Sequence, residues 1–408
     1  MTTPITWKNE QADLSGRPAL RALDSVARGC LALFLALSMF SISAAQSALT
    51  AGLLAWLAHT HFTGGWRALR WPVVVPFALF WLAAIVSVAL AEDPARAVWG
   101  LKKLPQVLLF FWALNLIRDR GERDRWVLLL IGSASAAALF GVYQAVSAGV
   151  SLSQRVNGTL SIYMTFSGLL MLVGLTVLGR LLFRRPREHW LAGVFCLLVF
   201  CLLLTLTRQA WLGVLVGGIF LIFLWRKTLL IAVPVVIFVL VLFSPQAVRD
   251  RMVSLTNYND VTLQERLALW RVGWMIFEDH PILGCGFYCV VQVRGEYPDP
   301  MNIVTRVNGM HSNVLQILVD TGLLGFAAWS ALWVCYLITV YRHAPPGGPK
   351  GMDWAAGAAM AAVLGFLAAG MFEANFYDSE VAMVLYFIMA LPFVRAEKAP
   401  AAAQKGAS

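Results

Sequence analysis

Residues 246–310, which begin QAVRDRMVSLTNYND and end VTRVNGM, form one polar stretch in a chain that is otherwise a series of apolar segments. The stretch is rich in arginine and leads directly into His311, and the chain becomes hydrophobic again at Gly322-Leu323-Leu324-Gly325. One substantial polar loop between long apolar runs is typical of a membrane protein with a single soluble region. A histidine where that loop meets the membrane suggests chemistry at the lipid–water interface.

The composition places the chain among integral membrane proteins. Hydrophobic residues make up 59% of its 408 residues and charged residues only 13%, which is about half the roughly 25% of a soluble domain. A spanning helix needs about 20 mostly apolar residues. We therefore predict an all-α polytopic membrane protein with about twelve transmembrane helices, near residues 27–44, 46–60, 71–91, 98–117, 126–147, 161–183, 190–207, 210–225, 228–245, 323–341, 353–372 and 379–394.

The basic residues orient these helices. If the N-terminus is cytoplasmic, most lysines and arginines gather at cytoplasmic helix ends, and the short loops on the other side keep only Arg96, Arg155 and Arg208. This is the asymmetry of the positive-inside rule, and it accounts for the net charge of +10 without a nucleic-acid partner. It predicts a cytoplasmic tail, nine helices, an outward-facing loop, three helices and a second cytoplasmic tail, at residues 1–26, 27–245, 246–322, 323–394 and 395–408.

The six cysteines do not form a disulfide framework. Cys285 and Cys289 lie in the outer loop, where a disulfide is permitted. Their C-x-x-x-C spacing is not the C-x-x-C of redox proteins, so we predict that these two thiols stay separate.

Basic residues near the outer edge of the membrane are candidates for function, because a charge beside the bilayer is costly. Arg208 lies at the tip of a hairpin between two apolar runs, and Arg155 lies in another outer loop. Lys102 and Lys103 lie together in an apolar segment, about 100° apart on a helix, so at most one of them faces a given cavity. Interfacial anchoring is the competing interpretation for Arg208.

The outer loop itself has helical periodicity from Thr262 to Ile276, which predicts a helix that lies on the membrane and carries Arg266. Either Asp260 or Thr262 can cap its start. His280, next to Pro281, is expected to be a turn residue at its end.

His311 opens an amphipathic stretch and can accept a proton near neutral pH. A hydrogen-bonded structural histidine is the other interpretation. The sequence contains no H-x-x-H or H-E-x-x-H pair, no G-x-S-x-G elbow and no Walker loop. An acidic triplet, Asp378-Ser379-Glu380, is only a weak candidate for a divalent cation, so no metal site is predicted.

Two motifs resemble the O-antigen ligase family. They are the run DHPILGCG at residues 279–286 and the pattern H-[NSQ]-x9-G-x2-[GTY], which His311, Ser312, Gly322 and Gly325 satisfy. The Thr207-Arg208 pair is similar to the arginine that the family carries at an outer hairpin. The pattern is shared with protein O-oligosaccharyltransferases and, more loosely, with O-antigen polymerases. A GT-C-like architecture, in which the large periplasmic loop contains interfacial helices, follows from the resemblance.

The resemblance implies a glycosyltransferase of the bacterial inner membrane, with its active site on the periplasmic face and no metal or cofactor. The donor would be O-antigen on undecaprenyl diphosphate, and the acceptor would be the lipid A–core oligosaccharide. His311 would be the general base, with Asp320 and Asp378 as secondary candidates. The donor diphosphate would be bound by basic side chains, namely Arg208, Arg266, Arg155, Lys103 and Lys102. A polymerase or a protein oligosaccharyltransferase is the alternative, and a lipid-linked glycan transporter fits less well.

Overall fold

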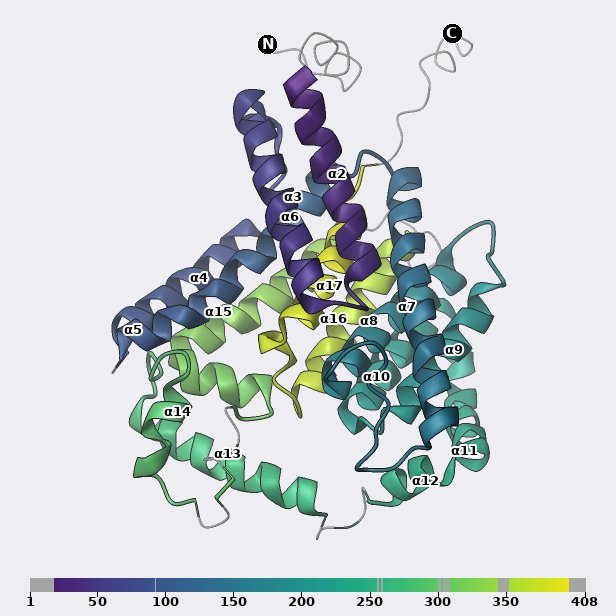
Figure 1. Cartoon of the computed structure of the whole chain (residues 1–408), viewed down its shortest axis with the longest axis vertical. Helices are drawn as coiled ribbons and strands as arrows, with labels where there is room; N and C mark the ends of the chain where they lie inside the picture. Colours follow the sequence, from purple (N-terminus) through teal and green to yellow (C-terminus); the bar gives the residue numbers. More distant parts are fainter. Residues whose placement is uncertain are drawn as a thin grey trace.

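Most of the chain is helical where its structure is described (Figure 1). The computed structural model describes residues 18–91, 93–254, 257, 260–299, 302–303, 306, 309–343 and 352–395, and no strand occurs in these ranges. Most of the two predicted cytoplasmic tails, residues 1–17 and 396–408, therefore lies outside the described residues.

The first half of the chain forms α2 to α9. Their bounds, with those of the intervening 3-10 helices, are α2 Pro18–Leu37, α3 Ile42–Phe62, η1 Gly65–Ala68, α4 Val74–Ala89, α5 Pro94–Ala97, η2 Val98–Val107, α6 Leu108–Leu116, α7 Arg120–Ala148, α8 Tyr163–Phe183 and α9 Leu191–Leu204.

The second half contains α10 to α17. Their bounds are α10 Arg208–Arg226, η3 Lys227–Ala232, α11 Val233–Phe243, α12 Gln246–Val253, α13 Val261–Asp279, α14 Cys289–Val293, η5 Arg294–Glu296, α15 Asn313–His343, α16 Trp354–Gly370, η7 Asn375–Tyr377, α17 Ser379–Ala390 and η8 Leu391–Phe393.

Several helices are suited to a bilayer. Among the residues that the structure describes, four helices can cross a membrane by length and composition: Arg120–Ala148, Tyr163–Phe183, Arg208–Phe243 and Asn313–His343. Four shorter apolar helices accompany them: Val74–Ala89, Leu191–Leu204, Trp354–Gly370 and Ser379–Phe393. The described part of the chain is thus an all-α membrane protein. The count of about twelve spans stays a prediction.

The core of the bundle is α8, which packs against α9, α10, α16 and α17 and is buried along almost its whole length. α16 is rich in alanine and glycine and packs closely against α10. A Cβ atom at Gly213 of α10 would lie 2.7 Å from the backbone oxygen of Gly365, and one at Gly217 would lie 2.7 Å from that of Ala361. Small residues allow two helices to approach this closely. Close packing stabilises their association in a membrane, because lipid supplies no hydrophobic force between helices.

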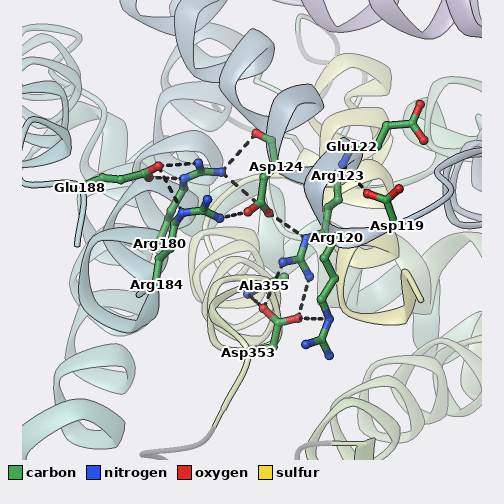
Figure 2. Close-up of polar contacts among 10 residues, drawn as sticks. All are labelled: Asp119, Arg120, Glu122, Arg123, Asp124, Arg180, Arg184, Glu188, Asp353 and Ala355. Carbon is green, nitrogen blue, oxygen red and sulfur yellow. Dashed lines mark hydrogen bonds and ion pairs between the residues drawn. The ribbon is translucent and has the colours of Figure 1, made fainter. Parts of the chain in front are cut away.

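A group of paired charges ties the helices together at one end of the bundle (Figure 2). Arg180 Nε lies 2.6 Å from Glu188 Oε2, and Arg123 NH1 lies 2.6 Å from Asp353 Oδ2. The two guanidinium groups also lie over the Trp354 ring, that of Arg123 at 4.8 Å and that of Arg180 at 5.2 Å from its centroid. The hydrogen bond from Arg180 holds the pKa of Glu188 below its usual value. These contacts join α7, α8 and the start of α16.

The opposite end carries α12, α13 and α14 of the polar stretch (Figure 1). α13 runs from Val261 to Asp279, close to the predicted helix. Its cap is Asp260, whose side chain accepts a hydrogen bond from Leu263 N at 3.1 Å, so Thr262 is not the cap. His280 follows the last turn, and its backbone N–H donates to Ile276 O, as the turn interpretation predicts.

α15 is interrupted at Gly322, where φ is 62° and ψ is −164°. The segment 281–286 fills this interruption with backbone hydrogen bonds. Cys285 N and Gly286 N donate to Val319 O and Asp320 O, both at 3.0 Å. On the other side of the break, Leu323 N and Leu324 N donate to Pro281 O and Ile282 O, at 2.9 and 3.2 Å. Since unpaired backbone groups are costly at membrane depth, the segment makes the break possible.

The thiols of Cys285 and Cys289 are joined in a disulfide, so the prediction that they stay separate was wrong. The chain turns at Gly284 and Gly286, which both have positive φ, and α14 then starts at Cys289. This turn brings the two Cα atoms to 5.6 Å, within the usual range for a disulfide. The cysteine spacing alone did not reveal the turn.

The break predicts a strong requirement for glycine at position 322. Gly322→Ala places a side chain in a left-handed conformation and against the backbone of Ile282, so we expect a loss of about 2 kcal/mol or more of stability. Gly132→Ala, in open space on α7, is the matched control and should be neutral or slightly stabilising. Thermal unfolding of the purified variants in nanodiscs measures both. Equal melting temperatures would show that the break tolerates a side chain.

Candidate active site

His311 is paired with Glu373. Its Nδ1 lies 3.0 Å from Glu373 Oε1 and 3.3 Å from Oε2, and the two side chains are 28% and 16% exposed. His311 has a φ of 46°, which is uncommon for a residue other than glycine. Such a backbone persists only where its surroundings enforce it, and it is typical of functional sites. The ring is thus held at a carboxylate while part of it stays accessible.

Four arginines gather at the same end of the bundle: Arg155, Arg208, Arg251 and Arg266. Arg208 contacts Ser254 Oγ and Asp260 Oδ1, each at 3.1 Å, and Arg251 lies 3.4 Å from Asp260 Oδ2. The charge of Glu373 acts on Arg266, as do those of Arg208 and Asp260. Arg155 lies over the Tyr163 ring at 4.5 Å and acts electrostatically on Arg251. We call these four side chains the arginine group.

The arginine group carries more positive charge than its neighbours balance. It faces the carboxylates of Asp260 and Glu373, which are two against four. Burial opposes ionisation of Asp260, but the hydrogen bond and charge of Arg208, with that of Arg251, hold its pKa below the usual value. Burial, followed by the charges of Arg208 and Arg155, lowers the pKa of Arg251 to about 10. Partly buried cations in excess favour the binding of an anion, and guanidinium groups match phosphate oxygens.

The members of this site lie at or near helix termini or in adjoining loops. Arg208 is the first residue of α10, after a turn in which Leu206 has a φ of 53°. Arg266 lies on the second turn of α13. Glu373 follows the end of α16, and Gln209 Nε2 donates to its Oε2 at 3.4 Å. The site is therefore assembled from segments that are far apart in the sequence.

The two predicted lysines lie apart from the arginine group. Lys103 Nζ donates to the backbone oxygen of Tyr377 at 2.5 Å, and its charged neighbours include Asp320, Asp378 and Glu380. Lys102 is exposed, which agrees with the expectation that only one of the two faces inward. The sequence could not show that the inward-facing lysine, Lys103, lies near carboxylates.

The two secondary acids are held by hydrogen bonds of their own. Asp320 is buried and accepts from Gln316 Nε2 at 3.0 Å and from Tyr377 OH at 2.6 Å. Asp378 accepts from Thr165 Oγ1 at 2.6 Å and caps α17. Within the ranges that the structure describes, no three histidine, cysteine or acidic side chains gather as metal ligands would.

Sequence reasoning gave no role to Glu373 as a partner of His311 or to Arg251 as a member of the arginine group. Glu373 was not predicted, because nothing in the sequence brings residue 373 to residue 311. Arg251 is one of several arginines in the polar stretch, and its burial to 4% exposure sets it apart only in the structure. An acidic residue at the outer end of a predicted span was the available signal for Glu373.

An apolar groove lies between α7, α9 and the start of α12. Three of the segments that line it continue within a few residues into an arginine. Val150 precedes Arg155, Leu204 precedes Arg208, and Ala247 precedes Arg251. The remaining lining residues are Val142, Ala145, Val146, Phe200, Pro245 and Gln246. The groove and the cations together suit an amphiphile with an anionic head.

Residues 192–330 match the family model described as O-antigen ligase. This match covers about a third of the 408 residues and supports assignment of the chain to the O-antigen ligase family. It contains Arg208 and His311, whereas Glu373 and Arg155 lie outside it. A comparison with curated proteins gave no match.

The contacts of Arg208 predict that this residue binds a diphosphate. Arg208→Ala should lower the affinity for farnesyl diphosphate by about thirtyfold or more, the effect of losing one partner of a close charge pair. Arg208→Lys should recover little, because a point charge replaces a planar fork. Arg96→Ala, an exposed arginine of the predicted outer side, is the control. Binding is measured in nanodiscs, and unchanged affinity in the alanine variant would make Arg208 an interfacial anchor.

Proposed function

We propose that this protein transfers O-antigen polysaccharide from undecaprenyl diphosphate to the lipid A–core oligosaccharide during lipopolysaccharide biosynthesis. The match to the O-antigen ligase family supports glycosyl transfer in general. The observation that carries the proposal is the His311–Glu373 pair beside an arginine group with positive charge in excess. A base and a cationic site for a leaving group are what this reaction requires.

His311 is the general base in this mechanism. Glu373 accepts the hydrogen bond from Nδ1, which fixes the neutral tautomer with its proton on Nδ1 and leaves Nε2 free to accept one. Nε2 takes the proton of the acceptor hydroxyl as the oxygen attacks the anomeric carbon. A new bond forms between that carbon and the acceptor oxygen, and the bond from the carbon to the diphosphate oxygen breaks. Direct displacement inverts the anomeric configuration, and a base of this kind contributes about 10²–10⁴-fold.

The arginine group stabilises the leaving lipid diphosphate. The diphosphate carries about two negative charges, and guanidinium groups bind its oxygens in bidentate fashion without a metal ion. Such charge stabilisation is oriented before the reaction begins, so its contribution is at least as large as that of the base. The lipid chain of the donor would lie in the apolar groove, since three of the segments that line it lead within a few residues to arginines of the group.

In this proposal the site faces the periplasm at the outer leaflet of the bacterial inner membrane. Donor and acceptor are both anchored in lipid, so they reach the site laterally, and the positive-inside charge distribution favours this orientation. A polymerase would use the same base and leaving group with a second lipid-linked glycan as acceptor. A protein oligosaccharyltransferase would use a serine or threonine hydroxyl. The acceptor therefore decides among them.

The direct test supplies purified protein with an undecaprenyl-diphosphate glycan and rough lipopolysaccharide, and identifies the glycosylated product. We expect glycan on the lipid A–core, and we expect the same rate in the presence of EDTA, because arginines take the place of a cation. Longer lipid-linked glycan without modified lipopolysaccharide would assign a polymerase. Activity that disappears with chelator and returns with Mg²⁺ or Mn²⁺ would refute the metal-free mechanism.

The proposed base predicts a large effect at His311. His311→Ala should lower transfer by about 10²-fold or more, and Glu373→Gln by about tenfold to a hundredfold, because the hydrogen bond from Nδ1 then goes to a neutral amide and no longer to a carboxylate. Both variants should fold normally, which is checked by protein abundance and gel filtration. His280→Ala, at the end of α13, is the control and should change transfer only as far as it changes abundance. A His311→Gln variant with a near-normal rate would mean that the ring only donates a hydrogen bond.

A further inference from the structure

We propose that Asn313 and Asn375 form an amide clamp that holds His311 against Glu373, so that both asparagines are positioning residues for the transfer reaction. This inference rests on the proposed catalytic role of the His311–Glu373 pair. None of the contacts described above joins Asn313 or Asn375 to the arginine group or to the exposed edge of the His311 imidazole.

The clamp repeats the spacing of the pair that it supports. Asn313 follows His311 by two residues, and Asn375 follows Glu373 by two residues. Asn313 Nδ2 donates to Asn375 Oδ1 at 2.5 Å, parallel to the contact between His311 and Glu373. The segments that carry His311 and Glu373 are thus hydrogen-bonded to each other two residues after the pair.

Further bonds make the clamp rigid. Phe376 N donates to Asn313 Oδ1 at 3.0 Å, so Asn313 uses both its donor and its acceptor on the segment after α16. Asn375 Nδ2 in turn donates to Phe366 O of α16 at 3.1 Å. Asn313 is fully buried and Asn375 is 6% exposed, and buried polar groups with satisfied partners specify one geometry.

Helix α16, which precedes Glu373, ends at a glycine that leaves space for the Asn313 amide. α16 ends at Gly370, where a Cβ atom would overlap Asn313 Nδ2. Glycine at this point therefore lets the amide approach the backbone directly. Asn313 itself is the first residue of α15, so the clamp joins the start of one helix to the end of another.

The opposite flank of His311 is held separately. Met310 N donates to Gln316 Oε1 at 2.9 Å, and Gln316 Nε2 donates to Asp320. His311 lies between these two attachments with its φ of 46°. A strained backbone needs such support on both sides. Because a displacement of about 1 Å can cost 10²-fold in rate, loss of the clamp should affect catalysis through the histidine.

A double-mutant cycle tests the clamp. Asn313→Ala should lower kcat about tenfold with little change in KM, because the base moves while the substrate sites stay. In a Glu373→Gln background, where the pair is already impaired, Asn313→Ala should lower kcat by less than about twofold, since coupled residues are not additive. Gly370→Ala, which displaces the amide without removing it, should repeat both results.

Asn115→Ala is the matched control. Asn115 is also an amide clamp, which accepts from Arg70 N at 2.9 Å and donates to Arg70 O and Phe111 O, but it lies on α6, away from the site. We expect its substitution to lower thermal stability, and any effect on kcat should be the same with Glu373 and with Gln at position 373. A change at Asn313 that behaves in this additive way has only a structural role and overturns the proposal.

A measurement without substrate completes the test. The chain has six histidines, and His311→Gln identifies the His311 signals in a ¹⁵N-histidine NMR spectrum. Asn313→Ala should move the Nδ1 signal toward its position in Glu373→Gln, and Asn115→Ala should leave it in place. If Glu373→Gln keeps full activity, the proposed catalytic pair fails. If Glu373→Gln is impaired but Asn313→Ala leaves kcat and the Nδ1 signal unchanged, only the clamp is wrong.

Discussion

The arrangement of the site depends on the backbone hydrogen bonds across the break in α15. A helix that stops at Gly322 exposes carbonyl and amide groups, and at membrane depth these need partners. Segment 281–286 provides them on both sides of the break, and its own glycine at 284 allows the close approach. The polar stretch is thereby attached to the helix that His311 precedes. Gly322 of the histidine motif and the DHPILGCG run therefore pack directly against each other.

The two ends of the bundle use arginine in different ways. At the end shown in Figure 2, Arg123 and Arg180 are buried, and each makes a close ion pair with an acid, Asp353 and Glu188 respectively. At the other end, the arginine group outnumbers its carboxylates. Removal of a partner from a buried ion pair is costly, so an unbalanced group is stable only if water or an anion compensates it. The ion pairs in Figure 2 are therefore structural, whereas the arginine group is suited to an anionic ligand.

The sequence predicted the class of protein and the parts of the site that lie in or next to the polar stretch. Apolar length and charge distribution depend on local composition, and so does the helix at 261–279 with its cap. Contacts over long sequence distances could not be predicted in this way. Glu373 is 62 residues from His311, and the direction of Lys103 depends on how η2 packs. The disulfide was missed for a related reason, because it depends on a turn and not on cysteine spacing.

The segment matched by the family model holds the histidine and most of the arginines, but not the whole site. Glu373 comes after α16, and Arg155 comes before α8. α8 and α16 pack against each other in the core, and Gly213 and Gly217 let α10 approach α16 closely. The position of Arg208 on α10 relative to Glu373 is consequently set by the packing of small residues within the bundle. The geometry of the candidate site thus depends on glycines and alanines in the interior of the bundle, which is why the site cannot be separated from the helices that lie outside the matched segment.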